Sequence, residues 1–276
     1  MHTFERELMN TVFTVRIAGA EQNYARSAAL DCFADVEALE NILSLYRYGS
    51  DISCINASEV GEITPLTDIA TECLSLAFTA AEISRGAIDV CMGEYFLKNK
   101  NDKTFAIPET PRRGKFEFDP QRFLIKKLSA GRIDLGAIGK GFAVDCAVKK
   151  LREVWEIKNA FLTFGGSSIY AFGKDGDGKP WEVNLSDDVK VPVDDFAVGA
   201  SGTSVLGAHI VDARTGETPK EQPFRTWAFC GNAAIADAMS TAFMLLKKDE
   251  IAEICAKENI SAAIQQTADS EIEFMD

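Results

Sequence analysis

The stretch that decides the expected local fold runs Arg132-Ile-Asp-Leu-Gly-Ala-Ile-Gly-Lys-Gly-Phe-Ala-Val-Asp145. Its first four residues alternate polar and apolar side chains, which predicts a short strand over 132–135 that carries one acid, Asp134. Three glycines follow within residues 136–141, so the backbone there can approach a ligand closely. Beyond them, apolar residues recur every three or four positions, which is typical of a helix. The stretch therefore predicts a strand, a glycine-rich turn and a helix, with Lys140 at the helix start.

A glycine-rich turn that opens a helix is a candidate anion site, because free backbone N–H groups and the helix dipole favour a phosphate or pyrophosphate there. Two common phosphate motifs do not fit. A Walker A loop needs glycine at position 134 and Ser or Thr at position 141, where this chain has Asp134 and Gly141. The glycines run G-x-x-G-x-G, which is not the dinucleotide pattern G-x-G-x-x-G. Taken alone, the stretch leaves a plain turn with an exposed lysine equally open.

The composition limits the classes of protein to consider. The chain has 276 residues, of which 46% are hydrophobic and 26% are charged, as in an ordinary globular protein of one large or two modest domains. Its formal net charge of −13 argues against a nucleic-acid partner. An acidic chain that binds a phosphate needs a local cation or dedicated N–H donors, so a divalent metal is plausible.

Targeting signals are not visible in the sequence. The first seven residues have no apolar core of a signal peptide, and we find no run of 18 apolar residues, so we expect no membrane insertion. The seven cysteines are scattered and include no C-x-x-C pair, which favours a reducing compartment over disulfides or a zinc site. We therefore expect a cytoplasmic protein.

The remaining pattern predicts an α+β fold with mostly antiparallel sheets packed with long helices, not alternating β-α-β units. Helices are expected over 22–46, over 68–84 and from Ala233 onward. A polar excursion or surface hairpin is expected over 98–118. Strands are expected at 8–17, 123–127, 132–135, 160–164, 169–172, 181–185, 196–201, 208–211, 225–230, 260–265 and 272–275.

The helix that follows Asn232 carries the strongest candidate for a metal site. Asn232 is a good N-cap residue. Asp237 and Thr241 are four residues apart, so they project from one face of the helix, among alanines and aliphatic residues. A carboxylate on such a face is unfavourable without a partner, and oxygen ligands from Asp and Thr suit Mg²⁺. An acid on the helix face that is hydrogen-bonded to backbone elsewhere is the open alternative.

Two further side chains are candidates for chemistry and for ligand binding. His209 lies in the expected strand 208–211, whereas His2 falls in an expected flexible terminus. Its ordinary pKa near neutrality makes His209 the default general base, although a strand histidine is more often structural. Tyr46 lies near the end of the first helix, where it is either a packing anchor or a flat surface for an aromatic ligand.

Eight short motifs, taken in order, resemble the ApbE family of FAD:protein FMN transferases. The resemblance extends over roughly residues 9–246, and the order of the motifs makes it specific. The motifs are Met9-Asn-Thr11, Tyr46-Arg-Tyr-Gly-Ser50, Gly86-Ala-Ile-Asp89, the stretch 133–145, Phe164-Gly-Gly166, Ser201-Gly202, His209-Ile-Val-Asp-Ala-Arg-Thr-Gly216 and Ala236-Asp-Ala-Met-Ser-Thr241.

The resemblance implies an ApbE-like (T-fold-like) single domain over residues 1–276, with the active site in a cleft between two subdomains. It implies a Mg²⁺-dependent enzyme that splits the pyrophosphate of FAD, passes FMN to a Ser or Thr hydroxyl of an acceptor flavoprotein and releases AMP. Hydrolysis of FAD to FMN and AMP, or FAD binding without catalysis, are the alternatives. His209 would take the proton of the attacking hydroxyl.

The resemblance also assigns ligand contacts by motif position. The residues expected to contact FAD are Met9, Tyr46, Ala87, Ile88, Asp89, Asp134, Lys140 and Ile210. The metal would be held by the backbone carbonyl of Ala137 and by the side chains of Asp237 and Thr241. Three positions depart from the family pattern: Cys91 stands where Thr is common, Ser167 where Asn often follows the two glycines, and Ala213 where Pro is usual. These departures leave the acceptor and the rate open.

Overall fold

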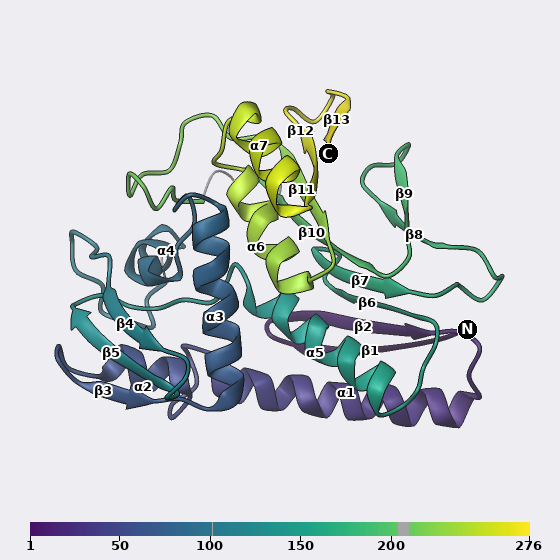
Figure 1. The fold of residues 1–276 in the computed structure, drawn as a ribbon, viewed down its shortest axis with the longest axis horizontal. Coiled ribbons are helices and arrows are strands. Elements are labelled where there is room, and N and C mark those ends of the chain that lie inside the picture. Colours follow the sequence, from purple (N-terminus) through teal and green to yellow (C-terminus); the bar gives the residue numbers. More distant parts are fainter. Residues whose placement is uncertain (101, 204–209) are drawn as a thin grey trace.

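The computed structural model describes residues 1–276 except residue 101 and residues 204–209. An eight-stranded antiparallel sheet forms its centre, with strand order β1-β2-β6-β7-β10-β11-β12-β13 (Figure 1). Its strands are β1 (His2–Leu8), β2 (Thr11–Ile17), β6 (Ala160–Phe164), β7 (Ser168–Phe172), β10 (Phe196–Gly202), β11 (Arg225–Cys230), β12 (Ser261–Gln265) and β13 (Ile272–Met275).

Two smaller sheets flank the large one. A three-stranded sheet has the order β3 (Ile63–Pro65), β5 (Leu124–Ser129), β4 (Lys115–Asp119), and a hairpin consists of β8 (Trp181–Asn184) and β9 (Lys190–Val193). The helices are α1 (Gln22–Leu43), α2 (Asp51–Ala57), α3 (Asp68–Ile83), α4 (Gly93–Asn99), α5 (Gly139–Glu153), α6 (Ala233–Phe243) and α7 (Lys248–Glu258), with a short 3-10 helix over Val90–Met92. The predicted α+β class with antiparallel sheets is confirmed.

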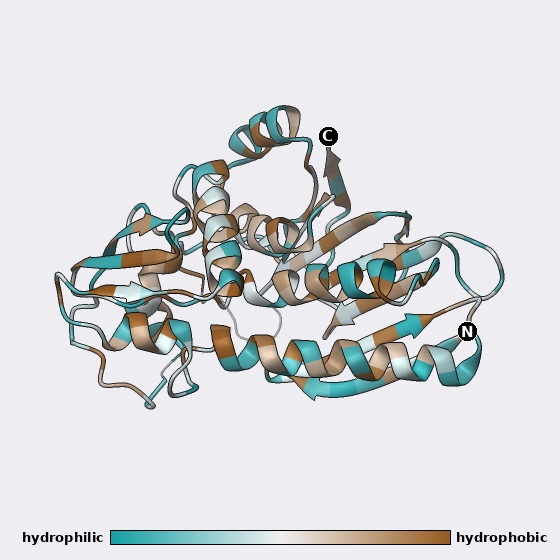
Figure 2. Ribbon diagram, turned by 60° about the horizontal axis from the view of Figure 1, so that its bottom comes forward, coloured by the Kyte–Doolittle hydropathy of each residue, from teal (hydrophilic) through white to brown (hydrophobic). Residues whose placement is uncertain are grey.

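The main core lies between the large sheet and the helices α1, α5 and α6. Phe13 of β2 and Phe164 of β6 stack with ring centroids 4.3 Å apart, and Phe33 of α1 packs edge-on against Phe13. Figure 2 shows hydrophobic and hydrophilic residues alternating along α1, as expected for a helix that buries one side. A second cluster on the other face of the sheet includes Trp181 of β8 and Trp227 of β11. Apolar clusters therefore pack against both faces of the large sheet.

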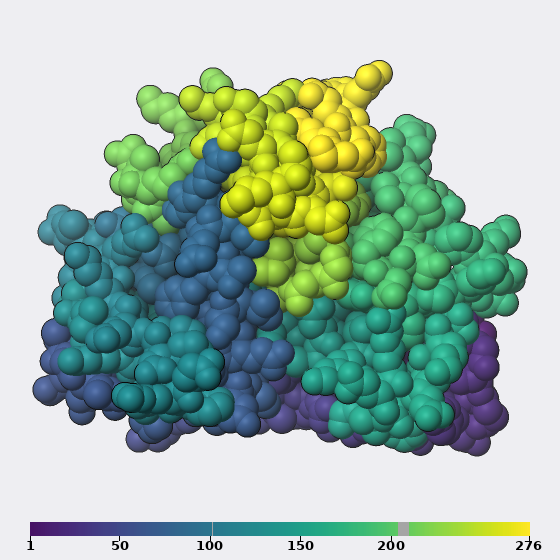
Figure 3. Space-filling view, in the orientation of Figure 1, coloured from purple at the N-terminus to yellow at the C-terminus, as the bar shows by residue number. Residues whose placement is uncertain are grey.

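Helix α3 lies between two parts of the molecule. In the space-filling view its blue segment separates the teal segment of β4 and β5 from the yellow-green helices α6 and α7 (Figure 3). Thr67 caps its N-terminus by accepting a hydrogen bond from the Ala70 N–H at 3.2 Å. Within the residues that the structure describes, none of the helices combines the length and apolar character needed to cross a membrane.

The N-terminal prediction was wrong in two respects. Residues 8–17 do not form one strand, because Met9 and Asn10 adopt φ values of 50° and 60° and make a tight turn between β1 and β2. His2 begins β1 and pairs with Ile17, so it does not lie in a flexible terminus. Local alternation could not show the turn, because neither residue is the glycine that usually marks a positive φ.

The predicted strand over 132–135 is also wrong, although the segment is ordered. The N–H of Ile133 donates to Asn56 Oδ1 at 2.7 Å, and its carbonyl accepts from Asn56 Nδ2 at 2.9 Å. The N–H of Asp134 donates to the carbonyl of Val90 at 2.9 Å. A buried side-chain amide and the 3-10 helix thus satisfy backbone groups that a neighbouring strand would otherwise bind. Strand β5, which contains most of the predicted strand 123–127, pairs with β3 and β4.

Other boundaries differ less. The first helix ends at Leu43, with Ser44 as its C-cap, and not near Tyr46. In the segment 98–118 the strand β4 begins only at Lys115. Residues 210 and 211, the described part of the predicted strand 208–211, are not in a strand. Helix α7 was not predicted. The helix from Ala233 begins as predicted, with the Asn232 side chain accepting from the Ile235 N–H at 2.9 Å.

Two glycines let α6 approach its neighbours at backbone contact distance. A Cβ atom at Gly141 of α5 would lie 2.1 Å from the carbonyl oxygen of Ala233. A Cβ atom at Gly199 of β10 would lie 2.0 Å from the carbonyl oxygen of Ala236. No side chain fits at either place, so α6 is held between α5 and β10 at a separation that only glycine permits.

We predict that Gly141→Ala destabilises the protein because backbone must move to admit the new methyl group. The free energy of unfolding in urea should fall by about 1–3 kcal/mol, the usual cost of overpacking. Gly231→Ala is the matched control, since a Cβ atom there meets nothing within 4 Å. The control should change the free energy by less than about 1 kcal/mol. Equal effects of the two substitutions would contradict the close-packing argument.

Candidate active site

A cavity of about 410 Å³ lies between the large sheet with α6 and the segment 66–114 that links β3 to β4. Its walls come from α3, the 3-10 helix, α4, the glycine-rich turn, β10 and α6. Eight of the residues predicted to bind FAD or the metal line it, namely Ile88, Asp89, Asp134, Ala137, Lys140, Ile210, Asp237 and Thr241. The fold therefore brings together residues that are up to 153 positions apart, since 241 − 88 = 153.

Asp237 has donors from three different residues around its carboxylate. Its Oδ2 accepts a hydrogen bond from the Gly141 N–H at 3.1 Å and lies 3.5 Å from the Lys140 ammonium. Its Oδ1 accepts a hydrogen bond from the Ser168 hydroxyl at 2.9 Å. The residue is only 3% exposed. The alternative of an acid satisfied by backbone is thus correct in part, because one partner is a backbone N–H of α5, close to the glycine-rich turn.

Ser168 was missed by sequence reasoning. It begins β7, directly after the Gly165-Gly166-Ser167 turn, and its side chain is buried. A serine in a strand carries no local signal of function, and its role depends on a contact with a helix 69 residues away. Only the tertiary packing of β7 against α6 identifies it.

Hydroxyl groups continue the polar wall beyond Asp237. The Thr241 hydroxyl donates to the Asp237 carbonyl at 3.3 Å and lies 3.1 Å from Ser201 Oγ of β10. Ser201 Oγ also shares a hydrogen bond of 2.9 Å with Ser240 Oγ. These contacts join one turn of α6 to β10. Asp237 and Thr241 therefore line the cavity from a part of α6 that is hydrogen-bonded to the sheet.

Two other buried carboxylates line the cavity, and each pairs with a more exposed cation. Asp134 Oδ1 accepts from the Gly136 N–H at 2.8 Å, and Lys100 Nζ lies 3.9 Å from its Oδ2. Asp89 accepts a hydrogen bond from Arg113 Nε at 2.8 Å. The cavity thus repeats one arrangement, a buried carboxylate held by a fixed donor with a long cationic side chain beside it.

Three residues predicted to contact FAD are not among those that line the cavity. The Tyr46 hydroxyl donates to Asp102 Oδ2 at 2.7 Å, and its ring lies 5.6 Å from that of Phe105. Burial, and then the hydrogen bond to Asp102, raise the pKa of Tyr46. Met9 and Ala87 are held through their backbones, by Glu40 and by Ala213. His209 lies outside the described residues.

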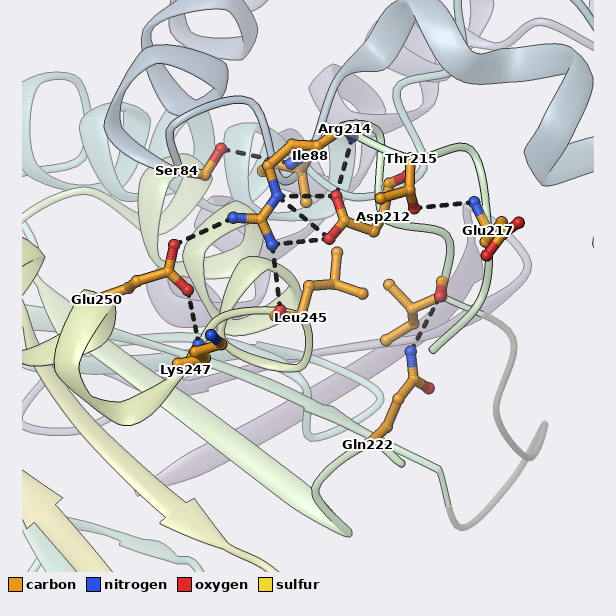
Figure 4. A network of polar contacts seen from close by, with 11 residues as sticks. Ser84, Ile88, Asp212, Arg214, Thr215, Glu217, Gln222, Leu245, Lys247 and Glu250 are labelled. Atoms are coloured by element: carbon orange, nitrogen blue, oxygen red, sulfur yellow. Dashed lines mark hydrogen bonds and ion pairs between the residues drawn. The ribbon is translucent and has the colours of Figure 1, made fainter. Parts of the chain in front are cut away.

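The turn after Val211 is anchored by Arg214 (Figure 4). The Arg214 guanidinium bonds both oxygens of buried Asp212, at 3.0 Å from Nε and 2.7 Å from the terminal nitrogen, and lies 3.1 Å from Glu250 of α7. A bidentate guanidinium–carboxylate pair fixes both position and orientation. Arg214 also donates to the carbonyl of Leu245, just after the end of α6, so the turn 210–217 is bound to this part of the chain. Ile210, at the start of the turn, lines the cavity.

The oxygen groups around Asp237 suit a divalent cation of the magnesium type. The described residues contain no group of three or more His, Cys, Asp or Glu side chains placed to hold a metal. Magnesium does not need such a group, because it commonly binds through one or two carboxylates and completes its shell with water and substrate phosphates. Asp237, Thr241 and Ala137 line one cavity and offer a carboxylate, a hydroxyl and a backbone carbonyl. The residues present therefore fit the ion.

A protein-family model described as the ApbE family matches residues 9–264 of this chain. The chain belongs to the ApbE family. Its relatives include the FAD:protein FMN transferases of Haemophilus influenzae, 24% identical over 79% of this chain and 72% of the relative, and of Chlamydia pneumoniae, 26% identical over 88% of this chain and 84% of the relative.

Solved structures of the ApbE family share the fold. The flavinyl transferase ApbE of Pseudomonas stutzeri superposes with a TM-score of 0.84 at 20% identity, covering 99% of this chain and 94% of that one. The ApbE protein of Thermotoga maritima gives a TM-score of 0.83 at 22% identity, covering 100% of this chain and 97% of that one.

The three departures from the ApbE pattern have different surroundings. Cys91 is buried, which raises the pKa of its thiol, and its N–H donates to Asp89 Oδ1 at 2.8 Å. Ser167 lines the cavity. The N–H of Ala213 donates to the carbonyl of Ala87 at 2.9 Å, a bond that a proline at this position could not make.

Asp145 links the two helices that meet at the site. Its carboxylate accepts hydrogen bonds from the N–H groups of Ala233 and Ala234, at 2.8 and 2.9 Å, and so caps the N-terminus of α6 from the side of α5. Burial raises the pKa of Asp145 to about 6, and the two backbone hydrogen bonds oppose that rise. The folded protein therefore keeps this proton over a pH range in which the unfolded chain has released it.

We predict a pH-dependent stability difference between the wild type and Asp145→Asn. Because the folded pKa is about 6 and the ordinary value is 3.8, the stabilisation from this proton is complete below pH 4 and is lost as the pH rises through 6. Asparagine does not titrate. The free energy of unfolding of the wild type, relative to the variant, should fall by about 1–3 kcal/mol between pH 4 and pH 7. A constant difference in urea unfolding across this range would contradict the assignment.

Proposed function

We propose that this chain transfers the FMN moiety of FAD to a Ser or Thr hydroxyl of an acceptor flavoprotein, in a Mg²⁺-dependent reaction that releases AMP. The observation that carries the proposal is the cavity in which the glycine-rich turn, Lys140, Asp237 and Thr241 meet. Membership of the ApbE family, whose matched relatives are FAD:protein FMN transferases, supports the same activity.

The chain's own groups suit the binding and splitting of a pyrophosphate. Lys140 supplies a positive charge at the start of α5, where a helix N-terminus already favours an anion. Asp237, Thr241 and the Ala137 carbonyl would hold Mg²⁺, which when bound neutralises charge on the pyrophosphate oxygens. Four of the other residues expected to contact FAD line the cavity, namely Ile88, Asp89, Asp134 and Ile210. The remaining three, Met9, Tyr46 and Ala87, are not among its lining residues.

The proposed transfer is a single substitution at the FMN phosphorus. The acceptor hydroxyl oxygen forms a bond to the FMN phosphorus, and the bond from that phosphorus to the bridging oxygen breaks. AMP leaves with the bridging oxygen. The proton of the hydroxyl passes to His209, a role that rests on the position of this residue in the family motif. If water replaced the hydroxyl, the same site would hydrolyse FAD.

Mass spectrometry of a candidate flavoprotein, co-expressed with this chain, tests the proposed function. We expect the mass of FMN to be added to one Ser or Thr residue. Asp237→Asn should reduce the modification by about 10²-fold or more, because an amide cannot replace an anionic ligand. Asp195→Asn is the matched control, since Asp195 pairs with Arg152 outside the cavity lining. Release of AMP from FAD without any modified acceptor would favour the hydrolase.

We further predict that His209→Ala lowers the transfer rate by about 10²–10⁴-fold, the usual effect of removing a general base, while FAD affinity stays nearly unchanged. Single-turnover transfer and FAD titration measure the two effects separately. His2→Ala is the control, because His2 is the other histidine of the chain and lies in β1. Weaker FAD binding with a normal transfer rate would assign His209 to binding.

A further inference from the structure

The Lys140 ammonium lies where the proposed function requires a metal cation. Its Nζ is 3.5 Å from Asp237 Oδ2, and the two side chains are 27% and 5% exposed. This ion pair and the proposed Mg²⁺ site therefore share one carboxylate. An ammonium and a divalent cation at adjacent positions on one carboxylate repel each other strongly in a partly buried site.

The three donors to Asp237 differ in their freedom to move. The Gly141 N–H belongs to the backbone of α5, which is pressed against the carbonyl of Ala233. The Ser168 hydroxyl is buried at the start of β7. Lys140 reaches Asp237 through a flexible four-carbon stem and is the most exposed of the three. Two donors thus orient the carboxylate, and the third can leave without a change in the fold.

We infer that Lys140 is a placeholder for the divalent cation. In the FAD-free protein its ammonium neutralises the buried Asp237 carboxylate. When the cation and FAD bind, the ammonium moves from Asp237 to a phosphate oxygen of FAD. The pyrophosphate makes the exchange favourable, because it brings the negative charge that accommodates both cations in one cavity. This inference rests on the metal site of the proposed function.

The other charged groups near Asp237 do not replace this role. Asp145 lies close enough for the two carboxylates to repel each other, but its own oxygens bind the N-terminus of α6. Lys100 belongs to the second lysine–aspartate pair of the cavity, where its Nζ lies 3.9 Å from Asp134 Oδ2. Lys100 therefore offers a matched control with the same charge in the same cavity and a different carboxylate partner.

Binding of Mn²⁺ to the FAD-free full-length chain, followed by electron paramagnetic resonance of the free ion, tests the exchange. Lys140→Met removes the competing ammonium and keeps an apolar stem. We expect it to tighten Mn²⁺ binding by about tenfold or more, whereas Lys100→Met should change it by less than about threefold. FAD binding, measured at saturating Mn²⁺, should change in the opposite direction. There Lys140→Met should weaken FAD binding by about tenfold, because the phosphate loses its ammonium partner.

Four outcomes would overturn the inference. Unchanged or weaker Mn²⁺ binding in Lys140→Met would show that the ammonium does not compete. An equal gain in Lys100→Met would show a general effect of charge. A gain that persists when Lys140→Met is combined with Asp237→Asn would place the ion elsewhere. Failure of the wild type and every variant to bind Mn²⁺, with or without FAD, would refute the metal site of the proposed function and the exchange with it. Lys140→Gln is the second variant if Lys140→Met does not fold.

Discussion

The structure depends on the close approach of α6 to α5 on one side and to β10 on the other. Gly141 and Gly199 permit this approach, because a Cβ atom at either position would lie within about 2 Å of an α6 carbonyl. The consequence is chemical as well as structural. At this separation a backbone N–H of α5 reaches the Asp237 carboxylate, and a strand hydroxyl reaches it from β7. If α6 lay farther from α5 and β10, the Asp237 carboxylate would be buried without these hydrogen-bond donors, which is unfavourable.

The same physical arrangement recurs at Asp89, Asp134 and Asp237. In each case a backbone N–H within a short distance holds the carboxylate, at 2.8 Å for Asp89 and Asp134 and at 3.1 Å for Asp237. A longer cationic side chain then balances the charge from the more exposed side. In a chain with a net charge of −13, two of these cations, Lys100 and Lys140, line the cavity. Such cations can serve an anionic ligand without disturbing the carboxylates that the backbone already holds.

Side-chain and backbone hydrogen bonds, rather than regular secondary structure, hold the turn 210–217 in place. Arg214 bonds Asp212 in a bidentate manner and reaches Glu250 (Figure 4). In addition, the N–H of Ala213 donates to the carbonyl of Ala87. Because alanine, unlike proline, has a backbone N–H, residue 213 links this turn to the segment that carries Ile88 and Asp89. A backbone hydrogen bond thereby joins the two segments that carry Ile88 and Ile210, both of which line the cavity.

Features that depend on near neighbours along the chain could be predicted from the sequence. Periodicity and capping predicted the antiparallel α+β class, the helix start at the glycine-rich turn, and a helix that begins after Asn232 with Asp237 and Thr241 on one face. These features follow from hydrogen bonds and side-chain spacing within a few residues. The sequence motifs also indicated eight expected FAD or metal contacts that line the cavity. The hydrogen-bond partners of these residues became known only from the tertiary structure. The Ser168 contact to Asp237 and the Asn56 amide that holds residues 132–135 join positions 69 or more apart, and local spacing carries no signal of such contacts.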